Sequence, residues 1–166
     1  SYEKVYTYDK ALNRSKQTVT STDCNYVVDY SYDRNNRLLT ETKTAGAELK
    51  LTTYTYDNNG NQLSKISETS GTSAGRSAGV LVMGDAGNSS YGDSFEAELR
   101  SYNQYNQLIK AETLEAIAEY NYKPDGLRHS KEVNGVITVH VWDGMNIAVE
   151  MNGQGAVIDR YVRGIN

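Results

Sequence analysis

The oxygen-rich stretch at residues 57–61 is the first place where residue types and spacing could support chemistry. Asp57 begins a run of side-chain oxygens at alternating positions, as in the first half of a calcium-binding loop. Glu68 falls where an EF-hand places its bidentate glutamate. Gln62, however, stands where that loop needs glycine, and no flanking helix is evident. A polar turn is therefore the favoured interpretation.

Other reactive side chains are too scattered to predict a catalytic centre. His129 and His140 lie eleven residues apart in different strand contexts, with no cysteine or third histidine nearby. Glu96 and Glu98 would share one strand face, but nothing marks a cleft around them. Cys24 is the one cysteine and cannot form an internal disulfide. We expect a non-enzymatic protein with no catalytic residue, no metal and no cofactor.

The more informative pattern is a repeated cassette, in which a tyrosine pair leads into a polar turn and then an apolar residue. The copies contain Tyr6, Tyr8 and Asp9; Tyr30, Tyr32 and Asp33; Tyr54, Tyr56, Asp57 and Gly60; and Tyr120, Tyr122 and Gly126. A weaker copy begins at Tyr102, and its turn opens on Asn103. The second tyrosines of the first three copies are 24 residues apart, which suits one β-hairpin per copy.

Side-chain alternation identifies the elements that would position these cassettes. In residues 26–32, three tyrosines and Val28 occupy one face while Val27, Asp29 and Ser31 occupy the other, which is typical of a half-buried strand. The turn residues between such stretches tolerate positive φ, so each hairpin should return as an antiparallel strand. We predict about a dozen strands and no helix. The further strands are expected at 38–44, 51–56, 63–68, 108–114, 116–122, 128–133, 136–142, 146–151 and 156–162.

Composition excludes several functional classes. The chain has 17 basic and 21 acidic side chains, both scattered, so no basic stripe predicts nucleic-acid binding. The longest apolar runs are only a few residues, so no membrane insertion is expected. Tyrosine occurs 14 times and phenylalanine once, which indicates half-wet sheet surfaces rather than a conventional core. The tyrosines could stack on sugar rings, but their matched positions favour packing across strands.

The chain reads as one repeat region, residues 1–166, interrupted by an insertion. Residues 67–94 are rich in serine, glycine, threonine and alanine, which predicts a flexible loop. Both ends of the chain open directly on strand-like sequence, so we expect a fragment of a longer protein. A sheet of this kind would carry two open edges, which predicts self-association.

The cassette resembles the YD repeat of RHS-repeat proteins, and the resemblance covers most of the chain except the insertion. The C-terminal stretch is its most specific part. It is similar to the segment that leads into the RHS-associated core of bacterial polymorphic toxins. Beyond Tyr120 and Tyr122, the matching residues include Arg128, Trp142, Asp143, Gly144, Tyr161 and Gly164.

This resemblance implies an all-β fold of antiparallel hairpin repeats that form a curved sheet strip, part of a hollow β-shell. Such shells enclose a C-terminal toxin domain, so the implied partners are the rest of the parent protein and its toxin cargo, at a secreted or cell-surface location. Many members release cargo by self-cleavage near a proline-containing motif, which is missing here; Pro124 lies in an expected turn. The alternative is a carbohydrate-binding or adhesion module that binds glycans.

Overall fold

The computed structural model describes residues 1–71 and 94–162, and these consist of antiparallel strands joined by turns. No helix occurs in these ranges, and hence none that is long and apolar enough to cross a membrane. The strands are β1 (Tyr2–Tyr8), β2 (Arg14–Ser21), β3 (Asn25–Tyr32), β4 (Leu38–Ala45), β5 (Glu48–Tyr56), β6 (Gln62–Ser70), β7 (Ser94–Tyr102), β8 (Leu108–Thr113), β9 (Ile117–Tyr122), β10 (Arg128–Val133), β11 (Val136–Asp143), β12 (Asn146–Asn152) and β13 (Val157–Arg160).

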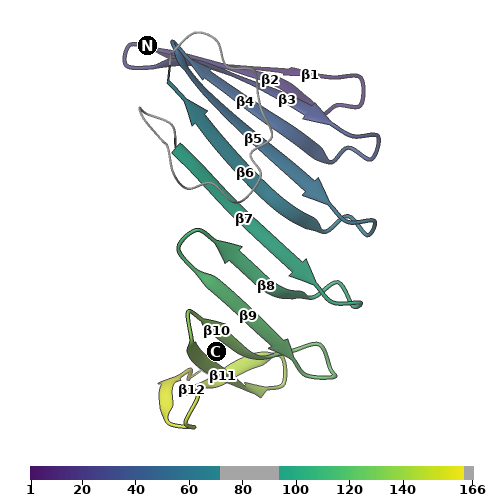
Figure 1. Ribbon diagram of the computed structural model, residues 1–166, viewed down its shortest axis with the longest axis vertical. Coiled ribbons are helices and arrows are strands. Elements are labelled where there is room, and N and C mark those ends of the chain that lie inside the picture. Colours follow the sequence, from purple (N-terminus) through teal and green to yellow (C-terminus); the bar gives the residue numbers. More distant parts are fainter. Residues whose placement is uncertain (72–93, 163–166) are drawn as a thin grey trace, which may run out of the picture. The chain divides into compact units, whose positions relative to one another are not determined.

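The strands are distributed over two compact units, Ser1–Ala97 and Glu98–Asn166. In the first unit, β1 to β6 lie side by side in sequence order, each antiparallel to the next (Figure 1). The second unit begins within β7 and follows the same rule to β13. The predicted all-β fold of antiparallel hairpins is confirmed. The division into two units was not predicted.

The cassette tyrosines of each unit share one face, which we call the tyrosine face. Because side chains alternate along a strand, Val28, Tyr30 and Tyr32 of β3 point to the same side. The pairing register carries this face across β2, since Gln17 lies opposite both Tyr6 and Val28. The alternation seen in the sequence therefore corresponds to a real face of the sheet.

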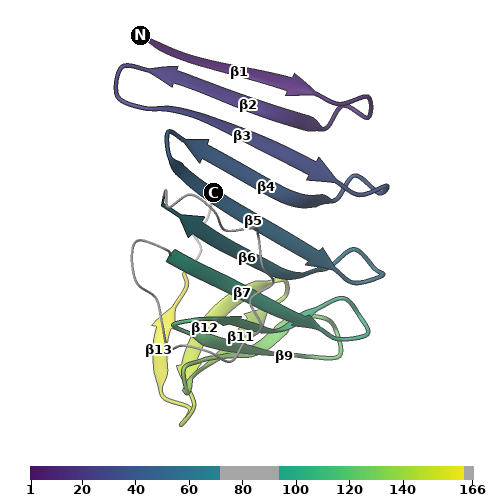
Figure 2. The ribbon, with the colours of Figure 1, turned by 45° about the horizontal axis from the view of Figure 1, so that its top comes forward.

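Each cassette turn is a three-residue hairpin loop followed by a β-bulge. In the first, the Asp9 N–H donates to Asn13 O at 2.8 Å and the Leu12 N–H donates to Asp9 O at 3.1 Å. This is a type I turn followed by one residue of positive φ, a common hairpin connection. The register then shifts, because Thr7 pairs with Lys16 but Tyr8 pairs with Arg14. All the cassette turns of the first unit lie at one end of its strands (Figure 2).

The buried interior is small and largely polar. Among the described residues, only two hydrophobic side chains are buried, Val19 at 1% exposure and Val28 at 4%. Both lie on the tyrosine face of the first unit. On the same face, Thr52 of β5 and Ser67 of β6 are buried and share a hydrogen bond of 2.9 Å between their hydroxyl oxygens. Stability must therefore rest heavily on hydrogen bonds and half-buried rings, as the tyrosine-rich composition predicted.

Two predicted boundaries need correction. The insertion was expected at 67–94, but β6 continues to Ser70 because its outer residues pair with β5 as far as Leu49. Residues 72–93 of the insertion lie outside the described residues. The last strand was expected at 156–162, whereas β13 is only Val157–Arg160, because its pairing with β12 covers only these residues.

Candidate functional site: a ladder of bonds between hairpins

The second tyrosine of three cassettes, and Trp142 at the corresponding position of β11, form a hydrogen bond to the preceding hairpin. Each donates to a backbone carbonyl beside the earlier turn. The four donor and acceptor pairs are Tyr32 to Arg14 O at 3.0 Å, Tyr56 to Leu38 O at 2.9 Å, Tyr122 to Leu108 O at 2.8 Å, and Trp142 Nε1 to Arg128 O at 2.8 Å. We call these bonds the lateral ladder. Tryptophan replaces tyrosine in the last one because its indole N–H can also donate.

The acceptor occupies the same position in every hairpin. Arg14, Leu38, Leu108 and Arg128 are each the first residue of a return strand, opposite the preceding tyrosine. A bulge begins there in each case and interrupts the backbone ladder between the strands. The phenol hydroxyl from the next hairpin supplies a donor at that interruption. The lateral ladder therefore joins hairpins where backbone pairing is weakest.

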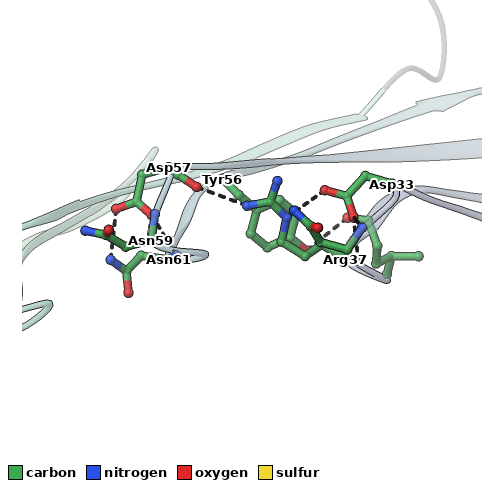
Figure 3. A network of polar contacts seen from close by, with 8 residues as sticks. Asp33, Arg37, Tyr56, Asp57, Asn59 and Asn61 are labelled. Atoms are coloured by element: carbon green, nitrogen blue, oxygen red, sulfur yellow. Dashed lines mark hydrogen bonds and ion pairs between the residues drawn. The ribbon is translucent and has the colours of Figure 1, made fainter.

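A carboxylate or amide oxygen builds each turn from within. In the turn of residues 57–61, Asp57 Oδ1 accepts the backbone N–H groups of Asn59 at 2.9 Å and Asn61 at 2.8 Å. Its Oδ2 accepts the Asn61 side-chain amide at 2.8 Å (Figure 3). The oxygens that suggested half of a calcium loop are thus used by the turn. In the described ranges, no group of three or more histidine, cysteine, aspartate or glutamate side chains could hold a metal.

The weaker fifth copy forms the same turn. Asn103 Oδ1 accepts the backbone N–H groups of Tyr105 at 2.9 Å and Gln107 at 3.1 Å. An amide oxygen accepts these bonds as a carboxylate does, so replacing aspartate preserves the geometry. In the next turn Lys123 holds this position, and Asp125 instead accepts the Leu127 N–H at 3.0 Å.

In three turns, the residue that closes the turn bonds forward to the next hairpin. Arg37 binds Asp33 Oδ2 through its Nε at 2.6 Å and donates from Nη1 to Asp57 O at 3.0 Å (Figure 3). Two other turns repeat this link. Asn13 donates to Asn36 Oδ1 at 2.8 Å, and Gln107 donates to Gly126 O at 3.4 Å. Three pairs of neighbouring hairpins are therefore joined in both directions, backward by a tyrosine and forward by a turn side chain.

Arginine side chains lie over the tyrosine rings. The Arg14 guanidinium is 4.3 Å from the ring centroid of Tyr6 and 5.9 Å from that of Tyr30, so it bridges β1 and β3 across β2. Similar contacts join Arg37 to Tyr56 at 5.1 Å and Arg128 to Tyr120 at 4.4 Å. Such cation–π contacts contribute about 0.5–1 kcal/mol each at exposed sites. The rings of Tyr6, Tyr30, Tyr56 and Tyr120 thus each have an arginine of the same protein over them.

The opposite face carries a second series of bonds, within each hairpin. The residue between the two tyrosines is serine, threonine or asparagine, and it bonds to a hydroxyl on the return strand. The pairs are Thr7 with Ser15 at 3.0 Å, Ser31 with Thr40, Thr55 with Ser64 at 2.6 Å, and Asn121 with Ser130 at 3.3 Å. Both faces of each hairpin therefore contribute polar bonds between strands.

The turn carboxylates predict acid sensitivity. The backbone N–H of Arg37 lowers the pKa of Asp33 below 3.8, and the Asn61 side-chain amide does so for Asp57. Because the folded pKa lies below the unfolded one, this stabilisation is complete above 3.8 and is lost as pH falls through the folded pKa. Urea midpoints should therefore decline as the pH falls below 3.8. An Asp33→Asn, Asp57→Asn double variant should decline less steeply, and an equally steep decline would contradict this origin.

The turn residue of positive φ is well chosen in every cassette except the first. It is Asn36, Gly60, Asn106 or Gly126 in later turns, with φ between 59° and 90°. In the first turn it is Leu12, with φ of 66°. A side chain larger than asparagine is strained in this region. The first hairpin therefore carries a local defect that glycine would relieve.

Replacing Leu12 with glycine should raise the free energy of unfolding by about 1 kcal/mol, because glycine adopts positive φ without strain. Urea denaturation measures this change. Gly60→Ala is the matched opposite. An added Cβ meets no atom within 4 Å there, so its expected loss of about 1 kcal/mol would come from the backbone alone. A Leu12→Gly variant less stable than the parent would show that the exposed leucine contributes packing instead.

The reactive side chains considered in the sequence do not converge on a site. Glu96 pairs with Lys50 Nζ at 3.0 Å, and Glu98 pairs with Arg100 Nη2 at 2.6 Å. Cys24 is exposed in the turn between β2 and β3. Each of these groups has a structural setting that does not need a substrate. The structure gives none of them a catalytic arrangement in the described residues.

One buried polar pair was missed. His140 is 6% exposed, and its Nε2 lies 3.4 Å from Oε1 of Glu150. Glu150 is the residue of β12 that lies directly opposite His140. Its ring meets Trp142 edge-on at 6.3 Å between centroids. His140 occupies the position of a first cassette tyrosine, two residues before the ladder donor. Reading Trp142 as a substitute for the second tyrosine would have revealed this. His129, by contrast, is exposed on β10.

Most residues predicted from the cassette therefore belong to one structural system. Tyr32, Tyr56 and Tyr122 are ladder donors, the aspartates build turns, and Gly60 and Gly126 hold the positive φ positions. Gly144 also has positive φ, in the β11–β12 turn that Asp143 precedes. Tyr161 follows β13, where its N–H donates to Ala148 O at 2.9 Å. Gly164 lies outside the described residues.

Comparison with known proteins adds no relative to this description. No protein-family model matches the chain, and no curated protein matches it significantly. The likeness to YD repeats consequently rests on the cassette itself and on the order of motifs near the C-terminal end. Any functional conclusion must therefore be argued from the hairpins and the bonds that join them.

Proposed function

We propose that this chain is a non-catalytic wall segment, which extends a β-sheet hairpin by hairpin to enclose another part of its parent protein. The lateral ladder carries this proposal. In three pairs of neighbouring hairpins, the later hairpin bonds back through a tyrosine and the earlier one bonds forward through a turn side chain. A hairpin that bonds to the hairpins on both sides of it can be repeated along a sheet, because each added hairpin meets the same donors and acceptors.

The residues also favour a wall over a binding pocket. Ring faces, phenol hydroxyls and turn carboxylates, which could recognise a ligand, are engaged with neighbouring hairpins. The sheet leaves both faces partly exposed, as expected for a surface with solvent on one side and cargo on the other. The proposed cargo is the C-terminal toxin domain that RHS-type proteins carry, and the proposed setting is a secreted or surface-exposed bacterial protein.

The test uses the complete reading frame that encodes residues 1–166. We expect it to encode further cassettes and a distinct C-terminal domain, and the intact protein should protect that domain from added protease. Opening the wall with Tyr32→Phe, Tyr56→Phe and Tyr122→Phe should accelerate cleavage of that domain. A Tyr105→Phe variant is the control, since Tyr105 is 73% exposed in a turn. Equal cleavage rates for the domain alone and within the intact protein would refute enclosure.

A carbohydrate-binding module is the second candidate, and it has less support. Several cassette rings are half-buried and lie under an arginine, so those rings do not present a free face to a sugar. The exposed tyrosines in the described ranges are Tyr2, Tyr8, Tyr105 and Tyr161. Glycan binding that is lost in Tyr105→Ala while the fold remains intact would favour this candidate over the wall.

A further inference from the structure

The charged side chains of β1 to β6 are unevenly divided between the two faces of the first unit. Alternation along each strand and the pairing register assign every strand residue to a face. Five of the six lysine and arginine side chains in these strands lie on the tyrosine face, namely Lys4, Arg14, Lys43, Lys50 and Lys65. Only two of the five acidic side chains lie there, Glu41 and Glu48. The opposite face has Lys16 with Glu3, Asp29 and Glu68.

This division gives an acidic protein one basic face. The charges appear scattered in the sequence, whose formal net charge is −4, because neighbouring residues of a strand point to opposite faces. Pairing of the strands then gathers the basic residues on one side. A surface of one sign attracts partners of the other sign, and this face combines its cations with phenol rings.

Two lysines of this face lie directly opposite each other, Lys43 on β4 and Lys50 on β5. Like charges in this arrangement destabilise a sheet. The Lys43 ammonium lies over the Tyr26 ring, 4.7 Å from its centroid, and Lys50 Nζ pairs with Glu96 Oε2 at 3.0 Å. The Glu96 side chain is 66% exposed, and an ion pair with so exposed a partner is weak, so another carboxylate can replace it at little cost. Further negative charge beside these lysines would relieve their repulsion.

We propose that the tyrosine face of the first unit binds an acidic segment of polypeptide. Ammonium, guanidinium and phenol groups all donate hydrogen bonds, and the carboxylates of aspartate and glutamate accept them while supplying the opposite charge. The inference draws on the proposed function only in taking this polypeptide to be the enclosed part of the parent protein. It then identifies the face of the wall that meets it.

The ring contacts favour a polypeptide over a single-stranded nucleic acid. Proteins that bind single strands stack the bases on open aromatic rings. Here Arg14 lies over the rings of Tyr6 and Tyr30, and Lys43 lies over that of Tyr26. A carboxylate needs only the outward N–H groups of these cations, so it can bind without displacing them. Tyrosine and arginine are also enriched where proteins contact one another.

Cross-linking of the full chain to poly-L-glutamate tests the face directly. A carbodiimide activates a glutamate carboxyl group, and a lysine amine lying against it forms an amide while the activating group leaves as a urea. Peptide mass spectrometry should find these amides at Lys4, Lys43 and Lys65, after correction for the reactivity of each lysine towards a small acylating reagent. Lys16 is the control, because it lies on the opposite face and its side chain is 48% exposed. An equal corrected yield at Lys16 would overturn the proposal.

Fluorescence anisotropy with labelled poly-L-glutamate gives a second measurement. The parent should bind at low salt, and its affinity should fall as salt is added. A triple variant with Lys4→Gln, Lys43→Gln and Lys65→Gln should bind about tenfold more weakly, because three surface ion pairs are lost. Cross-linking uses the unaltered protein and decides the matter if this variant fails to fold.

The matched variant removes the same charge from other places, with Lys10→Gln and Arg34→Gln in cassette turns and Lys16→Gln on the opposite face. It should bind within about twofold of the parent. No binding by the parent, or equal losses in the two triple variants, would refute the assignment. Tighter binding to oligothymidylate or to phosphatidylglycerol vesicles than to poly-L-glutamate would also refute it, because the partner would then be a nucleic acid or a membrane. Protease protection tests enclosure separately and does not depend on these outcomes.

Discussion

Replacing Tyr32 and Tyr56 together with phenylalanine should lower the free energy of unfolding of the first unit by about 2–3 kcal/mol. Each substitution removes one ladder bond and leaves the carbonyl of Arg14 or Leu38 without its donor. The rings stay, so packing and cation–π contacts are preserved. Urea denaturation of the single and double variants measures the loss. The two bonds join different pairs of hairpins, so their effects on the free energy of unfolding should be nearly additive.

The control for this experiment is Tyr105→Phe, which removes a hydroxyl from an exposed turn residue outside the ladder. Its stability should stay within about 0.5 kcal/mol of the parent. If the double variant were as stable as this control, the ladder bonds would be replaced by water without cost. The ladder could then no longer be regarded as the joint between hairpins.

Val19→Ala should be the most damaging single truncation, with an expected loss of about 2 kcal/mol in unfolding free energy. Val19 is 1% exposed and lies on β2 between Lys4 of β1 and Tyr26 of β3. Its two methyl groups fill space that its neighbours cannot close, because the paired strands hold their spacing. Thermal or urea unfolding reports the change.

The matched variant is Val5→Ala on the adjacent strand. Val5 is 46% exposed, so its truncation should cost about 0.5 kcal/mol or less in the monomer. Similar losses at the two positions would mean that the small interior of the first unit contributes little, and that hydrogen bonds alone hold the sheet together.

The strands and turns were largely predictable because both depend on local patterns. Alternation of tyrosine with polar residues indicated β3, and the expected strand at 128–133 matches β10 in full. Turn residues such as Asp57 and Gly60 were correctly identified from their chemistry. The division into two compact units was missed, because it depends on contacts between strands rather than on any local signal.

The lateral ladder could be predicted only in part. Its donors are conspicuous tyrosines, but its acceptors are backbone carbonyls, which every residue possesses. Choosing Leu38 as the acceptor of Tyr56 requires the register between β4 and β5, and a shift of one residue would present a different carbonyl. The bulge after each turn decides that register, and bulges have no strong signature in sequence. The fifth copy looked weaker in the sequence for a simpler reason. Its turn opens on Asn103 instead of aspartate, although Asn103 accepts the same turn hydrogen bond.

The repeat obeys a parity rule within each unit, because the second tyrosines of its cassettes lie on one face of that unit. The spacing is 24 from Tyr8 to Tyr32 and from Tyr32 to Tyr56 in the first unit, and 20 from Tyr102 to Tyr122 and from Tyr122 to Trp142 in the second. The shortening from 24 to 20 removes two residues from each of two strands, since β2 and β3 have eight residues and β8 and β9 have six. Loss of a single residue from one strand would turn the next phenol to the wrong side. Length variation in such a chain should therefore accumulate in even steps.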